Sequence, residues 1–273
     1  MSVFLTTFLL LQIILLFLYK SFIVDIAKKN EKNLVENTLQ IYHNTMESVL
    51  ERLDDNLDLL LGCRLLLTQL NGENNLEKVK AQHQMLQILK ERCKDTKEAD
   101  AYAIVNCKDN SILIQRNGNI TYDTIKDIKK YLQKRNTFDK TPTSGWTSTV
   151  MGEQVYLVKY YNYGANTIAV LISEKRLDSL LNYNDMSIKE AAFYLTDKKG
   201  KILCGSGEDW TYGEAIENLQ KQDPSISIYR GSVLEDAYQM YYSVKSSEYA
   251  AYSTSGIAIF GFLVLSLLFF GTI

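Results

Sequence analysis

Few side chains in this chain stand in a pattern that could support catalysis or hold a metal ion. The two histidines, His43 and His83, fall in predicted helices far apart, and neither belongs to a zinc-binding His-Glu-x-x-His pair. Gly205-Ser206-Gly207 lacks the Lys-Ser/Thr that follows in a phosphate loop, and no Gly-x-Ser-x-Gly nucleophile elbow exists. The sequence therefore predicts no enzymatic activity and no cofactor.

Four cysteines lie in the central part of the chain: Cys63, Cys93, Cys107 and Cys204. None belongs to a Cys-x-x-Cys pair, so a zinc site is not expected. In an exported domain they could form one or two disulfides in any of three pairings, and buried free thiols are an equal alternative. The net charge of −2 provides no basic footprint, so no nucleic-acid partner is expected.

The elements that would position any site lie between two apolar end segments. Val3 to Val24 supplies the roughly 20 mostly apolar residues that a membrane-spanning helix needs. No basic residue precedes this run and no small-residue cleavage site follows it, which favours an uncleaved anchor over a signal peptide. From Gly256 to Ile273 there is no charged residue. We predict transmembrane helices at residues 1–25 and 249–273.

A long helix is predicted from Ile26 to about Leu70, because this stretch has no proline and only one glycine, Gly62. Five apolar residues in it repeat with the 3-4-3-4 spacing of a coiled-coil seam: Leu39, Tyr42, Met46, Val49 and Leu53. Asn56 would be next and could fix the register of two paired helices. Alternatively, Leu57 replaces it as the helix turns onto its own domain, and we favour this second interpretation.

Shorter elements follow the turn at Asn71 to Asn75. A helix is predicted at about 76–94, with Val79, Met85, Leu86 and Leu89 on its apolar side. Residues rich in β-branched and aromatic types then predict five strands, with a helix at about 123–134 between the second and the third. The strands are 101–106, 111–116, 147–150, 155–163 and 167–173.

An internal repeat relates residues 101–113 to residues 191–203. Each copy reads as an apolar strand, a polar turn and a second apolar strand. Asn110 falls opposite Gly200, and both tolerate the positive φ of a tight hairpin. Helix-like stretches follow at 123–134 and 212–221, and 155–163 loosely corresponds to 238–244. The pattern predicts two α+β modules in tandem, the second short of its last strand.

This order of elements resembles the double Cache sensor regions of bacterial transmembrane receptors, which are tandem PAS-like modules. The resemblance covers about residues 26–245 and rests on element order rather than on invariant motifs. Leu195 to Ile202 looks like the first hairpin of such a module. Trp146, with the strands at 155–158 and 168–172, looks like the sheet that ends the membrane-distal module. The sensor regions of Gram-positive histidine kinases are the most similar.

The resemblance implies an α+β fold in which a long N-terminal helix is followed by two PAS-like antiparallel-sheet modules, flanked by two transmembrane helices. The distal module would span residues 26–183 and the proximal module residues 184–248. The chain would be the ligand-sensing part of a multi-pass receptor in the cell membrane, with residues 26–248 extracytoplasmic, a homodimer through the long helix, and an output domain outside this chain. The alternative is a membrane-anchored adhesion or assembly module without a signalling role.

The resemblance also implies a ligand cavity between the distal sheet and the loops and helix that cover it. Six residues are expected around it: Asp123, Arg135, Trp146, Tyr156, Tyr160 and Tyr161. Tyrosine and tryptophan offer an apolar face and a polar tip, which suits a sugar or another small polar metabolite. Tyr156 and Tyr160 share one face of a strand and Tyr161 lies on the other, so at least one placement must fail. Tyr131 and Arg135 only approach the amino-acid-binding motif of the family, because no Trp-Tyr pair follows them.

Overall fold

The computed structural model describes residues 2–117, 120–136, 145–181, 191–205, 210–222, 226–233, 238–245 and 261. Among the described residues there is no helix with both the length and the apolar composition needed to cross a membrane. The predicted second span, residues 249–273, lies outside the described part of the chain except for Gly261. The predicted first span begins the long helix α1, and most of its side chains are likewise not described.

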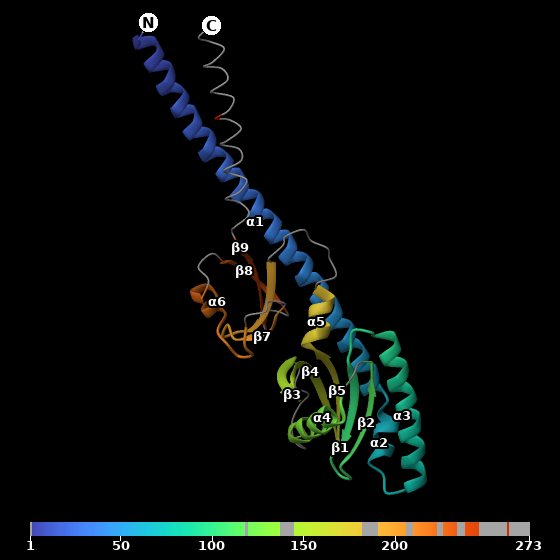
Figure 1. The fold of residues 1–273 in the computed structure, drawn as a ribbon. Helices are drawn as coiled ribbons and strands as arrows, with labels where there is room; N and C mark the ends of the chain where they lie inside the picture. Colours follow the sequence, from blue (N-terminus) through green and yellow to red (C-terminus); the bar gives the residue numbers. More distant parts are fainter. Residues whose placement is uncertain are drawn as a thin grey trace.

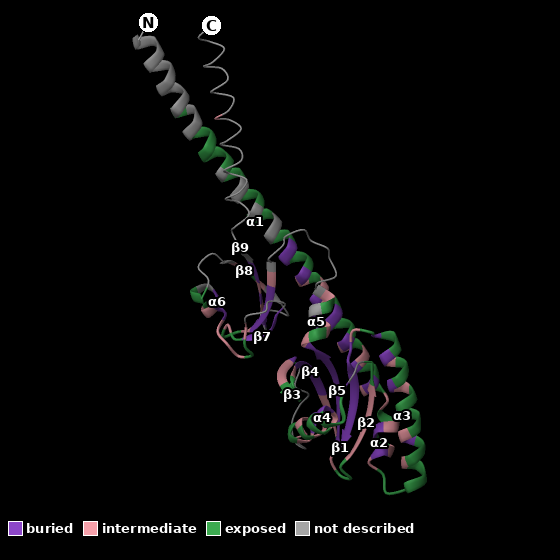
Figure 2. Ribbon diagram, viewed as in Figure 1, coloured by how far each residue is buried: buried purple, intermediate pink, exposed green. Residues whose placement is uncertain are grey.

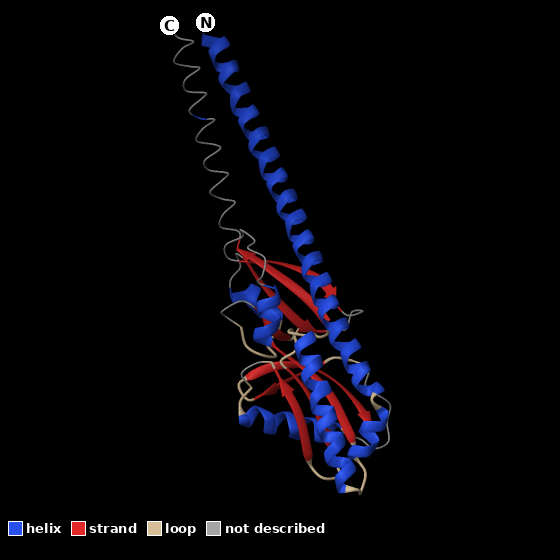
Figure 3. Cartoon of the chain, turned by 90° about the vertical axis from the view of Figure 1, so that its right-hand side faces the viewer, coloured by secondary structure: helices blue, strands red, loops and turns tan. Residues whose placement is uncertain are grey.

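Helix α1 (Ser2–Gly62) runs beside two modules, which follow one another along it (Figures 1 and 3). The helix ends earlier than the predicted Leu70, because the backbone leaves helical geometry at Cys63, with ψ at 42°. Glycine is costly in a helix, and Gly62 marks this break. Helix α2 (Arg64–Leu70) follows this break. Its carbonyls at Leu67 and Leu70 accept hydrogen bonds from Asn166 (2.8 Å) and Asn106 (3.0 Å), which tie it to the first sheet.

The apolar seam of α1 packs against the sheets of its own chain. All five seam residues are buried, and Leu57 is fully buried while Asn56 is only half-buried. The Tyr42 ring packs against the rings of Phe193 and Tyr242 of the second module, with centroid distances of 6.2 and 6.1 Å. The interpretation that the helix turns its apolar face onto its own domain is therefore confirmed. The same seam is not free to pair with a second helix.

The first module contains a five-stranded antiparallel sheet. Its strands are β1 (Ala101–Asn106), β2 (Ser111–Arg116), β3 (Thr147–Met151), β4 (Gln154–Tyr163) and β5 (Asn166–Ser173), in the order β2-β1-β5-β4-β3. Alternate side chains point to opposite faces. One face packs on α1, α2 and α3 (Asn75–Asp95), and the other packs on α4 (Tyr122–Arg135). The predicted strands are confirmed to within one residue at each end.

Helix α3 buries a different face from the one predicted. Its buried residues are Ala81, Met85, Leu89 and Cys93, one on each successive turn. Val79 and Leu86 are 61% and 37% exposed, so their assignment to the apolar side was wrong. The outward face of α3 is accordingly green along much of its length in Figure 2. This row of residues four apart packs against β1 and β2, and the small side chain of Ala81 lets the helix lie close to the sheet.

The second module has four described strands. They are β6 (Ala191–Asp197), β7 (Ile202–Gly205), β8 (Ile226–Val233) and β9 (Tyr238–Lys245), in the order β7-β6-β9-β8, with α6 (Ile216–Gln222) alongside. The two predicted hairpins are confirmed: Asn110 has φ 58° and Gly200 has φ +74°. Helix α6 begins four residues after the predicted start, since Gly213, with φ +79°, lies in a turn. The α+β class with two antiparallel sheets in tandem is confirmed.

The pairing of the strands corrects the predicted correspondence between the modules. Strand β9 pairs with β6 as β5 pairs with β1, so residues 238–245 correspond to 166–173 and not to 155–163. Strand β8 then corresponds to β4. Among the described residues, the second sheet lacks a counterpart of the edge strand β3 rather than of the last strand.

Helix α5 (Glu174–Leu181) follows β5 and lies near β7 of the second module. Its Leu177 is 1% exposed and belongs to a core cluster that contains residues of α1 and of both sheets. The modules also meet where the Tyr238 hydroxyl of β9 donates a hydrogen bond to the Trp146 carbonyl just before β3. Helix α5 and this bond are two connections through which the modules influence one another.

Candidate functional site

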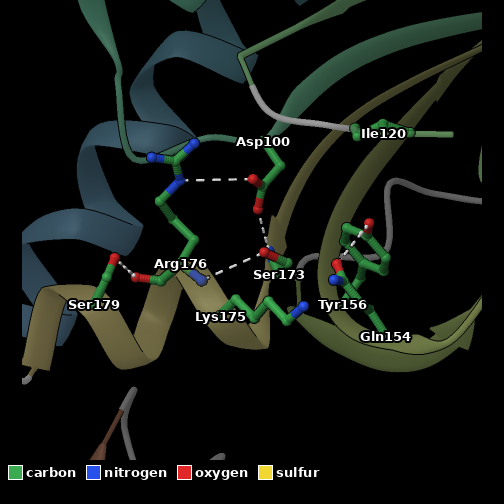
Figure 4. A pocket seen from close by; sticks show the side chains of 8 residues that line it. All are labelled: Asp100, Ile120, Gln154, Tyr156, Ser173, Lys175, Arg176 and Ser179. Atoms are coloured by element: carbon green, nitrogen blue, oxygen red, sulfur yellow. Dashed lines mark hydrogen bonds and ion pairs between the residues drawn. The ribbon is translucent and has the colours of Figure 1, made fainter.

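A pocket of about 360 Å³ opens where β5 passes into α5, beside the start of β1 and the start of β4 (Figure 4). Most of its lining is polar or charged. The lining residues are Asp100, Ile120, Gln154, Tyr156, Ser173, Lys175, Arg176 and Ser179. Small-molecule sites are concave and use convergent polar groups to fix the orientation of a ligand, and this pocket is more polar than most such sites.

Asp100 is the most constrained residue of the pocket. Its backbone N–H donates to the Leu171 carbonyl (2.9 Å), which joins the start of β1 to the end of β5. Its carboxylate, only 10% exposed, accepts the N–H of Ser173 and pairs with Arg176 Nε at 3.5 Å. A buried carboxylate is stable only when it is paired and hydrogen-bonded in this way. Asp100 is therefore held by groups of its own chain.

Tyr156 forms one wall of the pocket together with Ile120. The residue is 3% exposed, and its hydroxyl donates to Gln154 Oε1 at 3.3 Å. Burial raises the pKa of the Tyr156 phenol, and the negative charge of Asp100 raises it further. The phenol therefore stays neutral at physiological pH and presents an apolar ring with a polar tip.

Helix α5 supplies the cationic side of the pocket. Lys175 is exposed and extends from the first turn of α5 toward Tyr156 and Gln154, whereas Arg176 extends toward Asp100 (Figure 4). The Arg176 N–H donates to Ser173 Oγ at 3.4 Å, and the Ser179 hydroxyl donates to the Arg176 carbonyl at 2.8 Å. These groups can bind and orient a polar molecule. Among the described residues there is no cluster of side chains that could hold a metal ion.

Of the residues predicted to surround a ligand, Tyr156 lines this pocket. Tyr160 lies on the same face of β4, but it is 3% exposed in the core beneath α4. Tyr161 faces α1, where its hydroxyl donates to Asp54 Oδ1 at 3.2 Å. The expected alternation along β4 is thus confirmed, and it places Tyr161 on the side of the sheet away from Tyr156.

The other three predicted residues lie elsewhere in the first module. Trp146 is buried in the core cluster that contains α1. Asp123 and Arg135 stand near the two ends of α4 and are exposed. Asp123 contacts Lys126 at 3.4 Å, and the guanidinium of Arg135 lies 5.2 Å from the centre of the Tyr131 ring. The structure does not bring these residues together with Tyr156.

Sequence reasoning missed the residues at the strand ends. Asp100 directly precedes the predicted strand 101–106, and Ser173 to Arg176 end and follow the strand 167–173. If two antiparallel strands are neighbours, the start of one lies beside the end of the other. Charged residues at these two ends were a usable signal, but only with knowledge that β1 and β5 are adjacent.

No protein-family model matches the sequence, and no curated protein matches it. Similar solved structures are sensory domains. The periplasmic sensory domain of the Campylobacter jejuni chemoreceptor Tlp1 matches with a TM-score of 0.52 and 8% identity, over 76% of this chain and 92% of that chain. The ligand-binding domain of the Pseudomonas aeruginosa PAO1 amino acid chemoreceptor PctB, in complex with L-Arg, matches with a TM-score of 0.51 and 13% identity, over 78% and 96%.

The extracellular domain of soHK1S-Z6, described as a histidine kinase, matches with a TM-score of 0.50 and 14% identity, over 81% of this chain and 97% of that chain. At these identities the likeness is one of fold. The chain has the fold of sensory domains from chemoreceptors and a histidine kinase. The fold that the family resemblance implied is confirmed to that extent.

Proposed function

We propose that this chain is the ligand-sensing extracytoplasmic region of a transmembrane receptor, and that the pocket at the β5–α5 junction binds a small polar molecule. The observation that carries the proposal is the pocket itself, about 360 Å³ lined by polar side chains from β4, β5, α5 and the residue before β1. The fold supports it, since the matching domains are sensory and one of them holds L-Arg. This chain lacks the Trp-Tyr pair of the amino-acid-binding motif, so a sugar or another polar metabolite fits the proposal better.

The response would travel through helices that touch both modules. Helix α5 starts at the pocket, and its Leu177 is buried in the core cluster shared with α1 and the second sheet. On the other side of the first sheet, Lys159 and Tyr161 of β4 contact Asp54 of α1. A ligand shifts such an arrangement only as far as it binds one state more tightly than the other. The output region, which we expect to be a histidine kinase, would lie outside these 273 residues.

The proposal includes a membrane context. Residues 1–25 and 249–273 would anchor the chain, with residues 26–248 extracytoplasmic, and the unbroken path of α1 from Ser2 to Gly62 supports a direct link from the first segment to the body. A homodimer along α1 would have to use its exposed face, because the seam is buried in its own chain. Labelling of intact cells with a membrane-impermeant amine reagent should modify lysines of the body in membrane-bound protein. Labelling only after lysis would contradict this orientation.

Ligand binding can be tested by thermal unfolding of the full chain, kept in a mild non-ionic detergent, against sugars, organic acids and amino acids. A compound that binds the folded state raises the free energy of unfolding by mass action, by about 2.7 kcal/mol at 100 times its Kd, and so raises the unfolding midpoint. Ser179 is exposed at the pocket, so Ser179→Trp should fill it and abolish the shift. Gln84→Trp, on the exposed face of α3, is the matched control and should leave the shift intact.

The results separate the proposal from its alternative. A compound whose stabilising effect disappears in Ser179→Trp and persists in Gln84→Trp supports sensing at this pocket. A compound that stabilises both variants equally places binding elsewhere and contradicts the proposed site. If no compound shifts the midpoint, the proposal fails in favour of an adhesion or assembly module.

A further inference from the structure

The charged side chains of the pocket do not balance. Three of its lining residues carry charge, namely Asp100, Lys175 and Arg176. Asp100 and Arg176 pair with each other at 3.5 Å and neutralise one another. Lys175 forms no ion pair with any other residue in the described part of the chain, and its ammonium is directed toward Tyr156 and Gln154 (Figure 4). The pocket therefore presents one uncompensated positive charge to whatever enters it.

The neutral groups of the pocket also favour a ligand that accepts hydrogen bonds. Gln154 Oε1 accepts the hydroxyl of Tyr156, so the amide nitrogen of Gln154 retains two N–H donors. Ser173 Oγ accepts the N–H of Arg176, so the hydroxyl hydrogen of Ser173 is also free to donate. Together with the three N–H groups of Lys175, the pocket offers more donors than acceptors. A complementary ligand must be rich in acceptors.

Among the described residues, this pocket offers a ligand ammonium group no acidic partner that is free to bind it. Asp100 is the only acidic residue of the lining in the described part of the chain, and its 10% exposed carboxylate is already committed to Arg176 and to the N–H of Ser173. Withdrawing it would leave the Arg176 charge without its counterion, and breaking one half of a buried pair is strongly unfavourable. Lys175 would also repel a cation directly.

Resting on the proposed function, we infer that the ligand is a small carboxylate without a free ammonium group, whose anionic end is bound by Lys175 and Gln154. The ring of Tyr156 and the side chain of Ile120 would contact its carbon skeleton. A carboxylate accepts hydrogen bonds at both oxygens and matches the donor excess of the pocket. A charge-assisted hydrogen bond is roughly twice as strong as a neutral one, so the charge contributes most of the selectivity.

The test uses compounds of similar size and carbon skeleton that differ in charge. Butyrate, butyramide and 4-aminobutyrate, and in parallel succinate and succinamide, are titrated calorimetrically into the full chain in a mild non-ionic detergent at low and high salt. The acids should bind about tenfold or more tightly than their amides. The zwitterion should bind more weakly than butyrate. Affinity for the acids should fall as salt rises, because the Lys175 charge is exposed and therefore screened.

Two substitutions at Lys175 isolate its charge. Lys175→Met keeps the length of the side chain and should weaken the acids about tenfold while leaving the amides unchanged, and Lys175→Arg should restore the preference for acids. Lys80→Met, on the exposed face of α3, is the matched control and should change neither.

Failure of this inference is distinguishable from failure of the proposed function. If amides or sugars bind as tightly as acids, are blocked by Ser179→Trp and do not respond to Lys175→Met, the inferred ligand class is overturned and the pocket remains a sensing site. If no compound of either kind binds in a manner that Ser179→Trp abolishes, both are overturned.

Discussion

A buried ion pair joins β4 of the first sheet to α1, and its removal gives a quantitative test of how the two are held together. The side chain of Lys159 is 7% exposed and its ammonium pairs with Asp54, which is 31% exposed. The Tyr161 hydroxyl donates to the same carboxylate at 3.2 Å. Burial raises the pKa of Tyr161, and the charges of Asp54 and Asp58 raise it further, so the hydroxyl remains a donor.

The two halves of the pair should not be equivalent. Asp54→Leu leaves an ammonium without a counterion in a site that water barely reaches, which should cost about 3–5 kcal/mol of unfolding free energy. Lys159→Met leaves the Asp54 carboxylate, which is 31% exposed to water and still accepts the Tyr161 hydroxyl, and should cost only about 1–2 kcal/mol of unfolding free energy. The double substitution Asp54→Leu/Lys159→Met should lie within about 1 kcal/mol of the parent chain, because no buried charge remains.

Urea unfolding of the full chain, followed by far-UV circular dichroism and extrapolated linearly to zero urea, measures these differences. The double-substitution cycle should give a coupling of at least about 2 kcal/mol. The exposed pair Asp123–Lys126 is the matched control, and removing either member should change stability by less than about 0.5 kcal/mol. Equal costs for the two single substitutions, with an additive double, would refute the reasoning that a buried ammonium depends on Asp54.

Three further predictions concern the second module and the core. Tyr238→Phe should lower the unfolding free energy by about 1–2 kcal/mol, because it leaves the buried Trp146 carbonyl without its donor. Gly205→Ala should cost about 1–3 kcal/mol, because the new Cβ would lie 2.5 Å from Tyr194 Cδ1. Burial raises the pKa of the Cys93 thiol from 9.0 to about 11. As pH rises, this thiol therefore loses its proton in the unfolded chain before it does so in the folded chain. Stability should therefore be intact below pH 9 and fall between pH 9 and 11, with a smaller loss in Cys93→Ala.

Each of these has a control measured by the same urea unfolding. Tyr241→Phe removes a half-buried hydroxyl that donates to Gln239 Oε1 two residues away (2.9 Å), and should cost less than Tyr238→Phe. Gly62→Ala places a Cβ where no atom lies within 4 Å, and should raise stability by about 0.5–1 kcal/mol. If Tyr238→Phe costs no more than Tyr241→Phe, or Gly205→Ala no more than Gly62→Ala, the contact assigned to that residue is not the cause of the loss. If Cys93→Ala leaves the pH dependence of stability unchanged, burial of the Cys93 thiol is not its cause.

Local pattern accounts for much of the fold. The strands of the first module follow from runs of β-branched and aromatic residues, and the hairpin turns follow from Asn110 and Gly200, whose positive φ the structure confirms. Strand β8 was not singled out, because Gly231 and Arg230 interrupt its apolar alternation. The apolar face of α3 was misplaced because Val79 and Leu86 suit a core by composition, while β1 and β2 contact the row from Ala81 to Cys93.

The pocket was less accessible from sequence than the sheet around it. The aromatic residues of β4 suggested a ligand site, yet of the six predicted residues Tyr156 alone lines the pocket. The residues that define its charge, Asp100 and Lys175, flank strands that are separated by most of the first module in sequence. Only the β1–β5 pairing places them at one edge.

The sequence by itself determined the α+β class, the tandem repeat and the buried face of α1, because hydrophobic periodicity and turn residues act over a few neighbours along the chain. It could not determine what covers that face. Only the tertiary structure decided that the seam of α1 packs on its own two sheets and that β9 takes the place of β5. It alone also decided that, among the residues described, Asp100 has a counterion and Lys175 has none. Those outcomes depend on strand adjacency and on ion pairs between distant residues, which no local pattern encodes.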